Sequence, residues 1–403
     1  MGAAQKAVVL ISNDLSHPAL QEQQYSFSWR INRLRPLLKR GYTLVLVAGG
    51  GRVGRRGRPT LASLRPRITN DGRLVTISPP IVRIPMLWLL QSMFVTPLMV
   101  FLYCRQRRLE VEAVVASAVP YGVVGRFVNR VLHTALVVDY GDPDFARESG
   151  LSLRILHLLE SYVFTSKRDE AVTCIDPNIC DYVKRYGRED AVFLPPGGFW
   201  ADERREGKQH GTVGGQVIYA GHLAPPPAYR LDLLADAFPL VLKKFPGARF
   251  VILGEGDYLP TLRARVTKLG LTHSVELPGA VTYEEAKRRI RESQVAVQAL
   301  NDMCLGTKVM DYLSEGKAVV SCGSFYDSYS EFLVNGKNCI LVPPNATDLS
   351  DAIVRILSDP GLRQELETNA LRTVERYDYD SQADAMLELV GEVRERIALS
   401  ARP

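Results

Sequence analysis

Two charged residues, Lys308 and Asp311, stand three positions apart in a segment with the pattern of a short helix. Thr307 favours the N-cap position of such a helix, and Gly316 supplies the left-handed residue that ends many helices. A lysine in the first turn opposes the positive end of the helix dipole, so it is either there by chance or balanced by a bound anion. Asp311 shares the face of Lys308. The segment thus offers a cation for a phosphate beside a carboxylate that can accept hydrogen bonds from hydroxyl groups.

Apolar runs of strand length alternate with amphipathic stretches in both halves of the chain. Such alternation is typical of parallel sheets that are covered by helices on both faces. We therefore predict an α/β fold with two Rossmann-like, doubly wound domains that face each other across a cleft, where ligands of open sheets normally bind. The predicted strands are residues 8–12, 43–48, 113–117, 136–140, 171–175 and 192–194 in the first half, and 216–220, 250–253, 275–277, 295–299, 318–321 and 340–342 in the second.

The domain boundaries are predicted from changes in composition. We assign residues 1–200 to the N-terminal domain and residues 216–376 to the C-terminal domain. Residues 201–215, which are polar and charged and follow the sequence Pro195-Pro196-Gly197-Gly198, are predicted to be the linker. Residues 377–403 form a helical pattern with no strand after it, so we expect this helix to cross back to the N-terminal domain.

The composition of this 403-residue chain, 46% hydrophobic and 23% charged, fits two globular domains with filled cores and excludes a disordered protein. The net charge of +6 is unevenly distributed. The segment from Gly49 to Arg67 contains no acid and six arginines, which are Arg52, Arg55, Arg56, Arg58, Arg65 and Arg67. This stretch is either a solvated loop or a contact for anionic lipid or phosphate. Because it lacks interleaved aromatic residues, we do not expect nucleic-acid binding.

The six cysteines are scattered without a pair at redox or zinc-ligand spacing, so we expect buried free thiols. Since residues 7–12 already resemble a buried strand, no signal peptide is expected, and the predicted compartment is the cytoplasm. The stretch from Met86 to Tyr103 is nearly long enough to span a bilayer, although Gln91, Ser92, Thr96 and Pro97 interrupt it. It is a buried or interdomain helix, a helix that docks on a membrane, or a transmembrane span.

Residues 216–390 resemble the donor-binding domain of retaining glycosyltransferases with the GT-B fold, of the family-four (glycosyl transferases group 1) type. The resemblance lies in an ordered set of motifs, in which strands are followed by glycine turns and helices. The motifs are Tyr219-Ala220-Gly221-His222-Leu223, Arg230-Leu231-Asp232-Leu233-Leu234, Val251-Ile252-Leu253-Gly254-Glu255-Gly256, Val275-Glu276-Leu277-Pro278-Gly279, the segment 306–320 and the segment 336–343. Together they are more specific than any one glycine turn.

The resemblance implies a nucleoside-diphosphate sugar as donor substrate, with no required cofactor and no metal site; magnesium bound with the diphosphate remains an alternative. It assigns the leaving diphosphate to the cations Lys308 and Arg230, and the ribose to Asp311. The donor-binding residues it implies are Gly221, His222, Gly254, Gly306, Thr307, Asp311 and Glu331. In the first half, the sequence Val138-Asp139-Tyr140-Gly141-Asp142-Pro143 resembles the family more weakly, and Asp139 and Asp142 are expected to face the cleft; Asp142 is the third predicted catalytic residue.

The implied reaction is the transfer of a sugar to a hydroxyl group with retention, in the synthesis of a glycan, glycolipid or cell-surface polysaccharide. The acceptor is a glycan or a lipid-linked molecule, and peripheral membrane contact through Met86 to Tyr103 and the Arg52 to Arg67 loop would place the enzyme at the inner face of the cell membrane. Two departures from the family pattern, Met303 in place of a glutamate and His222 in place of an arginine, leave two alternatives. The departures indicate the first alternative, a non-catalytic GT-B partner subunit of an active transferase. The second alternative, a nucleotide-sugar epimerase, would share the same two-domain plan.

Overall fold

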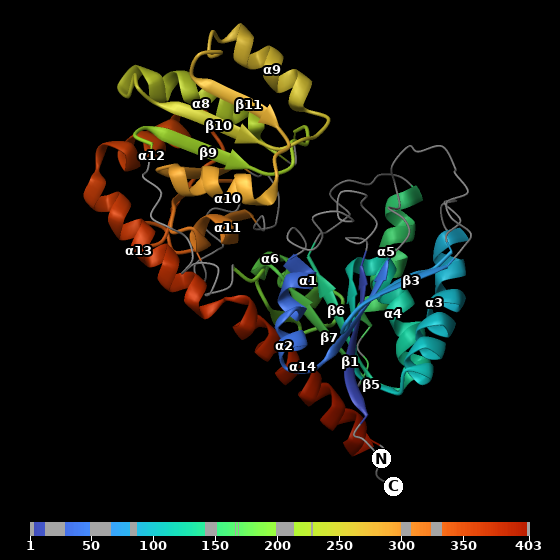
Figure 1. Ribbon diagram of the computed structural model, residues 1–403. Helices are drawn as coiled ribbons and strands as arrows, with labels where there is room; N and C mark the ends of the chain where they lie inside the picture. The colour runs from blue at the N-terminus through green and yellow to red at the C-terminus, as the bar shows by residue number, and fades with distance from the viewer. Residues whose placement is uncertain are drawn as a thin grey trace. The chain divides into compact units, whose positions relative to one another are not determined.

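The computed structural model (Figure 1) describes residues 4–12, 29–48, 66–80, 87–141, 151–165, 167, 169–198, 213–226, 229–299, 308–323 and 333–400. The chain divides into two compact units. The first unit is Met1–Pro195 together with Tyr379–Pro403, and the second is Pro196–Asp378. Each unit is an α/β layer structure around its own sheet, so the predicted pair of Rossmann-like folds is confirmed.

The first unit contains an eight-stranded sheet in the order β3-β4-β2-β1-β5-β6-β7-β8. All neighbouring strands are parallel except β3 and β4, which form a hairpin at the edge of the sheet. The strands are β1 (Gln5–Ser12), β2 (Thr43–Ala48), β3 (Arg67–Asp71), β4 (Leu74–Ser78), β5 (Leu109–Ser117), β6 (Ala135–Tyr140), β7 (Glu170–Cys174) and β8 (Val192–Phe193). The helices are α1 (Trp29–Leu34), α2 (Pro36–Lys39), α3 (Leu87–Gln106), α4 (Ala118–Leu132), α5 (Leu151–Phe164), α6 (Pro177–Lys184) and α14 (Tyr379–Ser400).

The last helix, α14, belongs to the core of the first unit although it follows the whole second unit in the sequence. Its side chains Ala383, Met386 and Val393 are buried in one cluster with the β1 residues Val8 and Leu10. Because these strand residues alternate along β1, they lie on one face of the sheet, and α14 covers that face.

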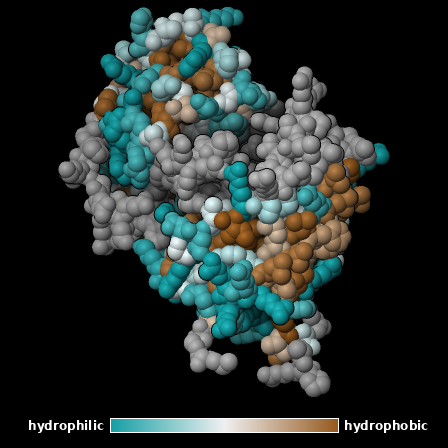
Figure 2. Space-filling model, turned by 45° about the vertical axis from the view of Figure 1, so that its right-hand side comes forward, coloured by the Kyte–Doolittle hydropathy of each residue, from teal (hydrophilic) through white to brown (hydrophobic). Residues whose placement is uncertain are grey.

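Helix α3 is long and apolar on all sides. It is the one described helix whose length and composition would allow it to cross a membrane, and it is only partly buried inside the protein. Trp88 packs against Tyr121 of α4 with ring centroids 5.8 Å apart. The opposite face of α3 is exposed, and Figure 2 shows its apolar side chains within the brown area at the right.

The second unit contains a six-stranded parallel sheet in the order β11-β10-β9-β12-β13-β14. Numbered within the unit, this is the strand order 3-2-1-4-5-6 of a Rossmann fold. The strands are β9 (Gln216–Ala220), β10 (Arg249–Leu253), β11 (Val275–Gly279), β12 (Val295–Ala299), β13 (Ala318–Cys322) and β14 (Ile340–Val342). The helices are α8 (Leu231–Lys244), α9 (Leu259–Lys268), α10 (Tyr283–Glu292), α11 (Lys308–Ser314), α12 (Ala346–Ser358) and α13 (Pro360–Arg376).

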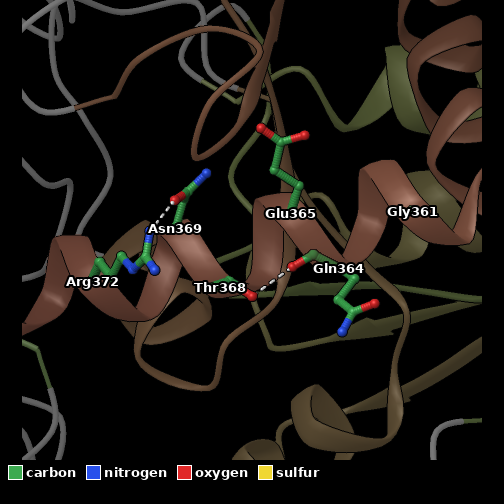
Figure 3. A pocket seen from close by; sticks show the side chains of 6 residues that line it. All are labelled: Gly361, Gln364, Glu365, Thr368, Asn369 and Arg372. Atoms are coloured by element: carbon green, nitrogen blue, oxygen red, sulfur yellow. Dashed lines mark hydrogen bonds between the residues drawn. The ribbon is translucent and has the colours of Figure 1, made fainter.

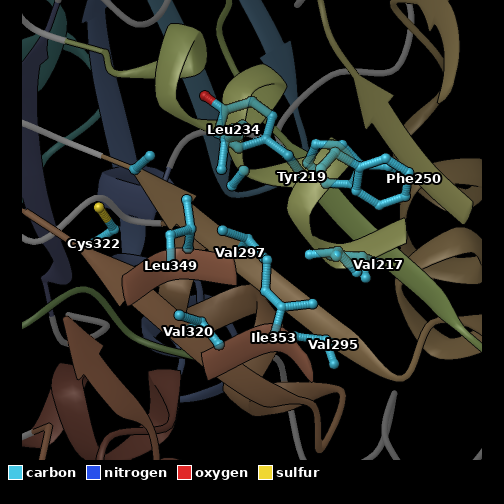
Figure 4. Packing of buried hydrophobic residues seen from close by; sticks show 14 of the residues in the cluster. Val217, Tyr219, Leu234, Phe250, Val295, Val297, Val320, Cys322, Leu349 and Ile353 are labelled. Atoms are coloured by element: carbon cyan, nitrogen blue, oxygen red, sulfur yellow. The ribbon is translucent and has the colours of Figure 1, made fainter. Parts of the chain in front are cut away.

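The core of the second unit lies between this sheet and the helices α8 and α12 (Figure 4). Val217 and Tyr219 of β9 and Val297 of β12 point into it, and Leu234 and Ile353 come from the two helices. Alternate residues of each strand face this cluster, as expected for a sheet that is covered by helices. The core therefore holds the carboxyl ends of β9 and β12 in position, and the residues of the candidate site follow these two strand ends.

Candidate functional site

The strand order of the second unit reverses between β9 and β12, which are hydrogen-bonded neighbours in the sheet although β10 and β11 lie between them in the sequence. In open α/β sheets, ligands bind outside the carboxyl ends of the strands at such a switch point. Gly221 directly follows β9, and Lys308 begins α11, the first described element after β12. The structure brings these two predicted residues together, 87 positions apart in the sequence.

One backbone hydrogen bond joins the Gly221 turn to the end of β10, and another joins the next turn, at Gly254, to the end of β11. The amide of Gly221 donates to the Leu253 carbonyl at 3.0 Å, and the amide of Gly254 donates to the Gly279 carbonyl at 2.9 Å. A Cβ atom on Gly254 would lie 1.8 Å from the carbonyl oxygen of Gly221. No side chain fits in this space, so Gly254 supports the Gly221 turn through backbone contact.

The ammonium group of Lys308 lies between two tyrosine rings. Its Nζ atom is 4.4 Å from the ring centroid of Tyr219 and 4.8 Å from that of Tyr229, and it donates a hydrogen bond of 2.8 Å to the Tyr219 hydroxyl. Aromatic faces attract a cation without carrying a net charge, so these contacts position the ammonium group and do not cancel its charge. A Cβ atom on Gly221 would lie 2.8 Å from the same Nζ. The absence of a side chain at position 221 thus leaves the space that Lys308 fills.

The Tyr219 hydroxyl is fixed on both sides. It accepts from Lys308 and donates to the carbonyl of His222 at 2.9 Å. Loss of water around the buried ring raises the pKa of Tyr219 well above its ordinary value, so the hydroxyl keeps its proton as the geometry requires. Tyr312 of α11 holds the other side of the turn, because its hydroxyl accepts from the Ala220 amide at 2.8 Å. Neither tyrosine was predicted to have a role, although Tyr219 and Tyr312 lie within the motifs that resemble the family.

Asp311 lies one turn after Lys308 on α11. Loss of water around its carboxylate and the neighbouring charge of Glu315 raise its pKa from 3.8 to about 7, against the opposing effects of Lys287 and Lys308. Near neutral pH the side chain therefore exists in both protonation states. A hydrogen-bond donor such as a ribose hydroxyl would favour the ionised state, so the predicted role of Asp311 is chemically suited to its position.

Arg230 caps the start of α8, where its amide donates to the carbonyl of Ala299 at the end of β12 at 3.2 Å. Its guanidinium group is bound to the carboxylate of Asp232, with Nη2–Oδ2 and Nε–Oδ1 distances of 3.0 and 3.1 Å. Arg230 was predicted to be a cation for the diphosphate, and its pairing with Asp232 was not predicted. Of the two predicted cations, Lys308 is the one that lies against the Gly221 turn.

Four predicted site residues, Asp142, Gly306, Thr307 and Glu331, lie outside the described residues, as does Met303. The expectation that Asp139 faces the cleft is wrong. Its side chain is buried, pairs with Arg33 at 3.0 Å and accepts a hydrogen bond from Thr173 at 2.8 Å. Asp139 therefore stabilises the interior of the first unit.

The five described cysteines, Cys104, Cys174, Cys180, Cys322 and Cys339, are buried free thiols, as predicted. Within the described ranges, no three His, Cys, Asp or Glu side chains are placed to hold a metal ion. A shallow hollow of about 380 Å³ lies along α13 (Figure 3), far in sequence from the predicted residues. Its described lining residues are Gly361, Gln364, Glu365, Thr368, Asn369 and Arg372, none of which was a predicted site residue.

Comparison with known proteins identifies related sequences and folds. Residues 214–359 match the family model described as glycosyl transferases group 1. An alpha-D-kanosaminyltransferase of Streptomyces kanamyceticus is 24% identical over 155 residues, which are 38% of this chain and 39% of that protein. A phosphatidyl-myo-inositol mannosyltransferase of Mycobacterium tuberculosis is 25% identical over 225 residues, which are 52% of this chain and 57% of that protein. The matches thus span about half or less of the length of these relatives.

A solved structure supports the fold over nearly the whole chain. The Anabaena protein HepE in complex with UDP-glucose superposes with a TM-score of 0.65 at 13% identity, and the match covers 96% of this chain and 99% of that chain. At this level of identity, the likeness concerns the fold of the chain.

Proposed function

We propose, from the premise that this chain belongs to the glycosyl transferases group 1 family and has the GT-B fold, that it is a retaining glycosyltransferase. It transfers a sugar from a nucleoside-diphosphate sugar to a hydroxyl group of a glycan or lipid-linked acceptor. The observation that carries this proposal is the contact between Lys308 and the Gly221 turn at the switch point of the second sheet.

The contact supplies what such a donor requires. A diphosphate carries charge that must be met by cations and exposed backbone amides, and the absence of a side chain at Gly221 lets the ligand approach the backbone. Lys308 adds a positive charge whose direction is fixed by Tyr219 and Tyr229. Because the ammonium group is held in place before the ligand arrives, little ordering is required on binding.

The same arrangement suits the chemical step. As the bond between the sugar and the diphosphate breaks, negative charge grows on the leaving diphosphate, and a prepositioned cation stabilises this transition state more than the ground state. Lys308 is the cation that stabilises the leaving diphosphate. Arg230 is paired with Asp232, so we assign it a contribution to the electrostatic potential around the start of α8.

The names of the compared proteins suggest which ligands to test. The Anabaena structure holds UDP-glucose, and the mycobacterial relative is named for the mannosylation of phosphatidyl-myo-inositol. UDP-sugars are therefore the first donors to test, and GDP-sugars are included because the sequence does not determine the base. Lipid-linked and free glycans are the acceptors to test.

The test is a screen of the full chain with a panel of UDP- and GDP-sugars, in which release of the nucleoside diphosphate and formation of product are measured with and without acceptors. Transfer with the anomeric configuration of the donor preserved, read by NMR of the product, supports the proposal. Two outcomes contradict it. Donor binding without release would favour a non-catalytic partner subunit, and interconversion of the free sugar nucleotide would favour an epimerase.

A further inference from the structure

The exposed face of α3 is apolar along almost its whole length. Five side chains on this face are between 45% and 68% exposed, and they are Leu87, Leu90, Phe94, Leu98 and Leu102. Their spacing of three or four residues places them on one side of the helix. We call this set the α3 stripe. A helix on the surface of a soluble domain usually shows polar residues to water on this side, so the stripe calls for a partner.

The other face of α3 is part of the core of the first unit. Trp88, Val100 and Tyr103 are buried there, and burial raises the pKa of the Cys104 thiol to about 11. The Phe94 ring also contacts Phe127 of α4 edge-on, with centroids 6.0 Å apart. Because one face is packed inside the protein and Pro97 lies within the helix, α3 offers only its exposed face to a partner.

The part of the sequence that contains the α3 stripe is rich in arginine, and exposed arginines follow the stripe at the end of α3. Residues 49–108 contain eleven arginines and one acidic residue, Asp71, so this segment carries ten positive charges while the remainder of the chain is net negative by four. Arg105 is exposed and continues the line of the stripe, and Arg107 and Arg108 follow it, both exposed. Arg67 and Arg73 on the β3–β4 hairpin are exposed as well.

We infer that the α3 stripe is a docking surface for an anionic lipid bilayer, with the helix lying in the plane of the membrane interface. Apolar side chains and arginines are the two kinds of group that such an interface binds. The apolar side chains enter the acyl region, and the arginines contact the anionic headgroups. The α3 stripe shares no residue with the donor site.

A second copy of this chain fits the stripe less well. A two-fold symmetric contact would place the same surface of both copies together, and so would put the exposed Arg105, Arg107 and Arg108 of both copies in one interface. Anionic headgroups would neutralise the same charges. The charge distribution therefore favours the lipid surface over self-association.

The test measures co-sedimentation of the full chain with vesicles of phosphatidylcholine that contain phosphatidylglycerol, compared with vesicles of phosphatidylcholine alone. We expect binding to the anionic vesicles that weakens as salt is added. Leu98→Glu should lower the partition by about tenfold or more, on the scale of burying one leucine side chain. Leu158→Glu is the matched control, because Leu158 is 71% exposed on α5 of the same unit and outside the stripe. It should bind as the unchanged protein does.

Insertion of the stripe is measured separately with a tryptophan probe. In the Phe94→Trp variant, lipids with brominated acyl chains should quench a larger part of the tryptophan fluorescence than in the unchanged protein. In the Leu158→Trp variant, the quenched part should not increase. Equal binding by the Leu98→Glu and unchanged proteins would overturn the inference. So would the absence of binding to anionic vesicles. A dimer, seen by analytical ultracentrifugation, that Leu98→Glu dissociates would then assign the stripe to self-association. The experiment uses no donor or acceptor, so its failure leaves the proposed transfer reaction untouched.

Discussion

Lys308 and Tyr219 are joined twice, by a hydrogen bond of 2.8 Å from Nζ to the phenolic oxygen and by the approach of Nζ to 4.4 Å from the ring centroid. One contact is directional and the other depends on the ring alone. Substitutions at Tyr219 can therefore separate the two contributions to the position of the cation.

Tyr219→Phe should keep the cation–π contact and remove the hydroxyl that links Lys308 to the His222 carbonyl. We expect a loss of about 1 kcal/mol in the free energy of unfolding, the typical value of one hydrogen bond, and nucleotide affinity that falls only a few-fold. Tyr219→Leu removes the ring as well and should weaken nucleotide binding further. Calorimetric titration with UDP and GDP, beside denaturant unfolding, measures both effects. Equal nucleotide affinity for the Leu variant and the unchanged protein would mean that the ring does not position Lys308.

Gly221→Ala should displace Lys308, because the added Cβ would lie 2.8 Å from Nζ and 2.9 Å from Cε. The lysine end is flexible, but φ at Gly221 is +159°, a value that residues with side chains rarely adopt, so we expect some loss of stability. We also expect about tenfold weaker nucleotide binding, the scale of one charge-assisted hydrogen bond. The control is Gly214→Ala, since a Cβ there meets no atom within 4 Å. If both variants bind nucleotide with the affinity of the unchanged protein, the Gly221 turn is not part of the site.

Asp311 makes stability depend on pH in a predictable direction. Its pKa in the folded protein is about 7 and its ordinary value is 3.8, so between these pH values the folded state holds a proton that the unfolded state has lost. The stability contribution of the protonated group is complete below about pH 4 and is lost as the pH rises to 7. Asp311→Asn should therefore gain stability over the unchanged protein across this window, by on the order of 2 kcal/mol at pH 7. Denaturant midpoints at pH 4.5 to 8 measure the difference, and a difference that does not vary with pH would contradict it.

Nucleotide binding gives Asp311 a second readout. A ribose hydroxyl that donates to the ionised carboxylate should strengthen binding as the pH rises through 7. The phosphate groups of the nucleotide titrate in the same range, so the Asn variant serves as the reference. We expect the ratio of the two affinities to rise with pH; a constant ratio would remove Asp311 from the ribose contact.

Asp139 and Arg33 form a buried pair that also binds the chain where it leaves the first unit, since Arg33 donates to the carbonyls of Leu194 and Pro195 at 3.0 and 2.9 Å. Asp139→Ala would leave the Arg33 charge buried without its carboxylate, at a cost of about 3–5 kcal/mol in the free energy of unfolding. Asp181→Ala, which breaks an exposed pair with Lys184, should change stability by less than about 1 kcal/mol. Equal unfolding midpoints for the two variants would show that the buried pair does not stabilise the unit.

Much of the fold followed from local pattern. Each predicted strand has a counterpart because buried parallel strands are continuous apolar runs that the sequence displays directly. The β3–β4 hairpin was missed, since every residue of β3 is exposed and no apolar alternation marks it. The apolar pattern that precedes β2 forms two short helices, α1 and α2, because Pro36 has no amide hydrogen to donate and so interrupts the regular helical hydrogen bonds.

The site was predictable only in part, because its contacts join residues that are far apart in the chain. The type and position of Lys308 indicated a phosphate-binding cation. Its contact with Tyr219 could not be predicted, because the two residues are 89 positions apart in the sequence. Arg33 lies 106 residues before Asp139, and no local signal distinguished that buried pair from an exposed carboxylate at a strand end. The Arg230–Asp232 pair was close enough to predict, since the two residues are separated by one position at the start of a helix.

The central claim is that Lys308 meets the diphosphate of the donor at the Gly221 turn. Titration calorimetry with UDP and GDP on the unchanged protein, Lys308→Ala and Lys268→Ala tests it most directly, because Lys268 is an exposed lysine on α9 of the same unit. We predict that Lys308→Ala weakens binding by about 10- to 100-fold, the value of a charge-assisted contact, and that Lys268→Ala has no effect. Equal affinity for all three proteins would contradict the account.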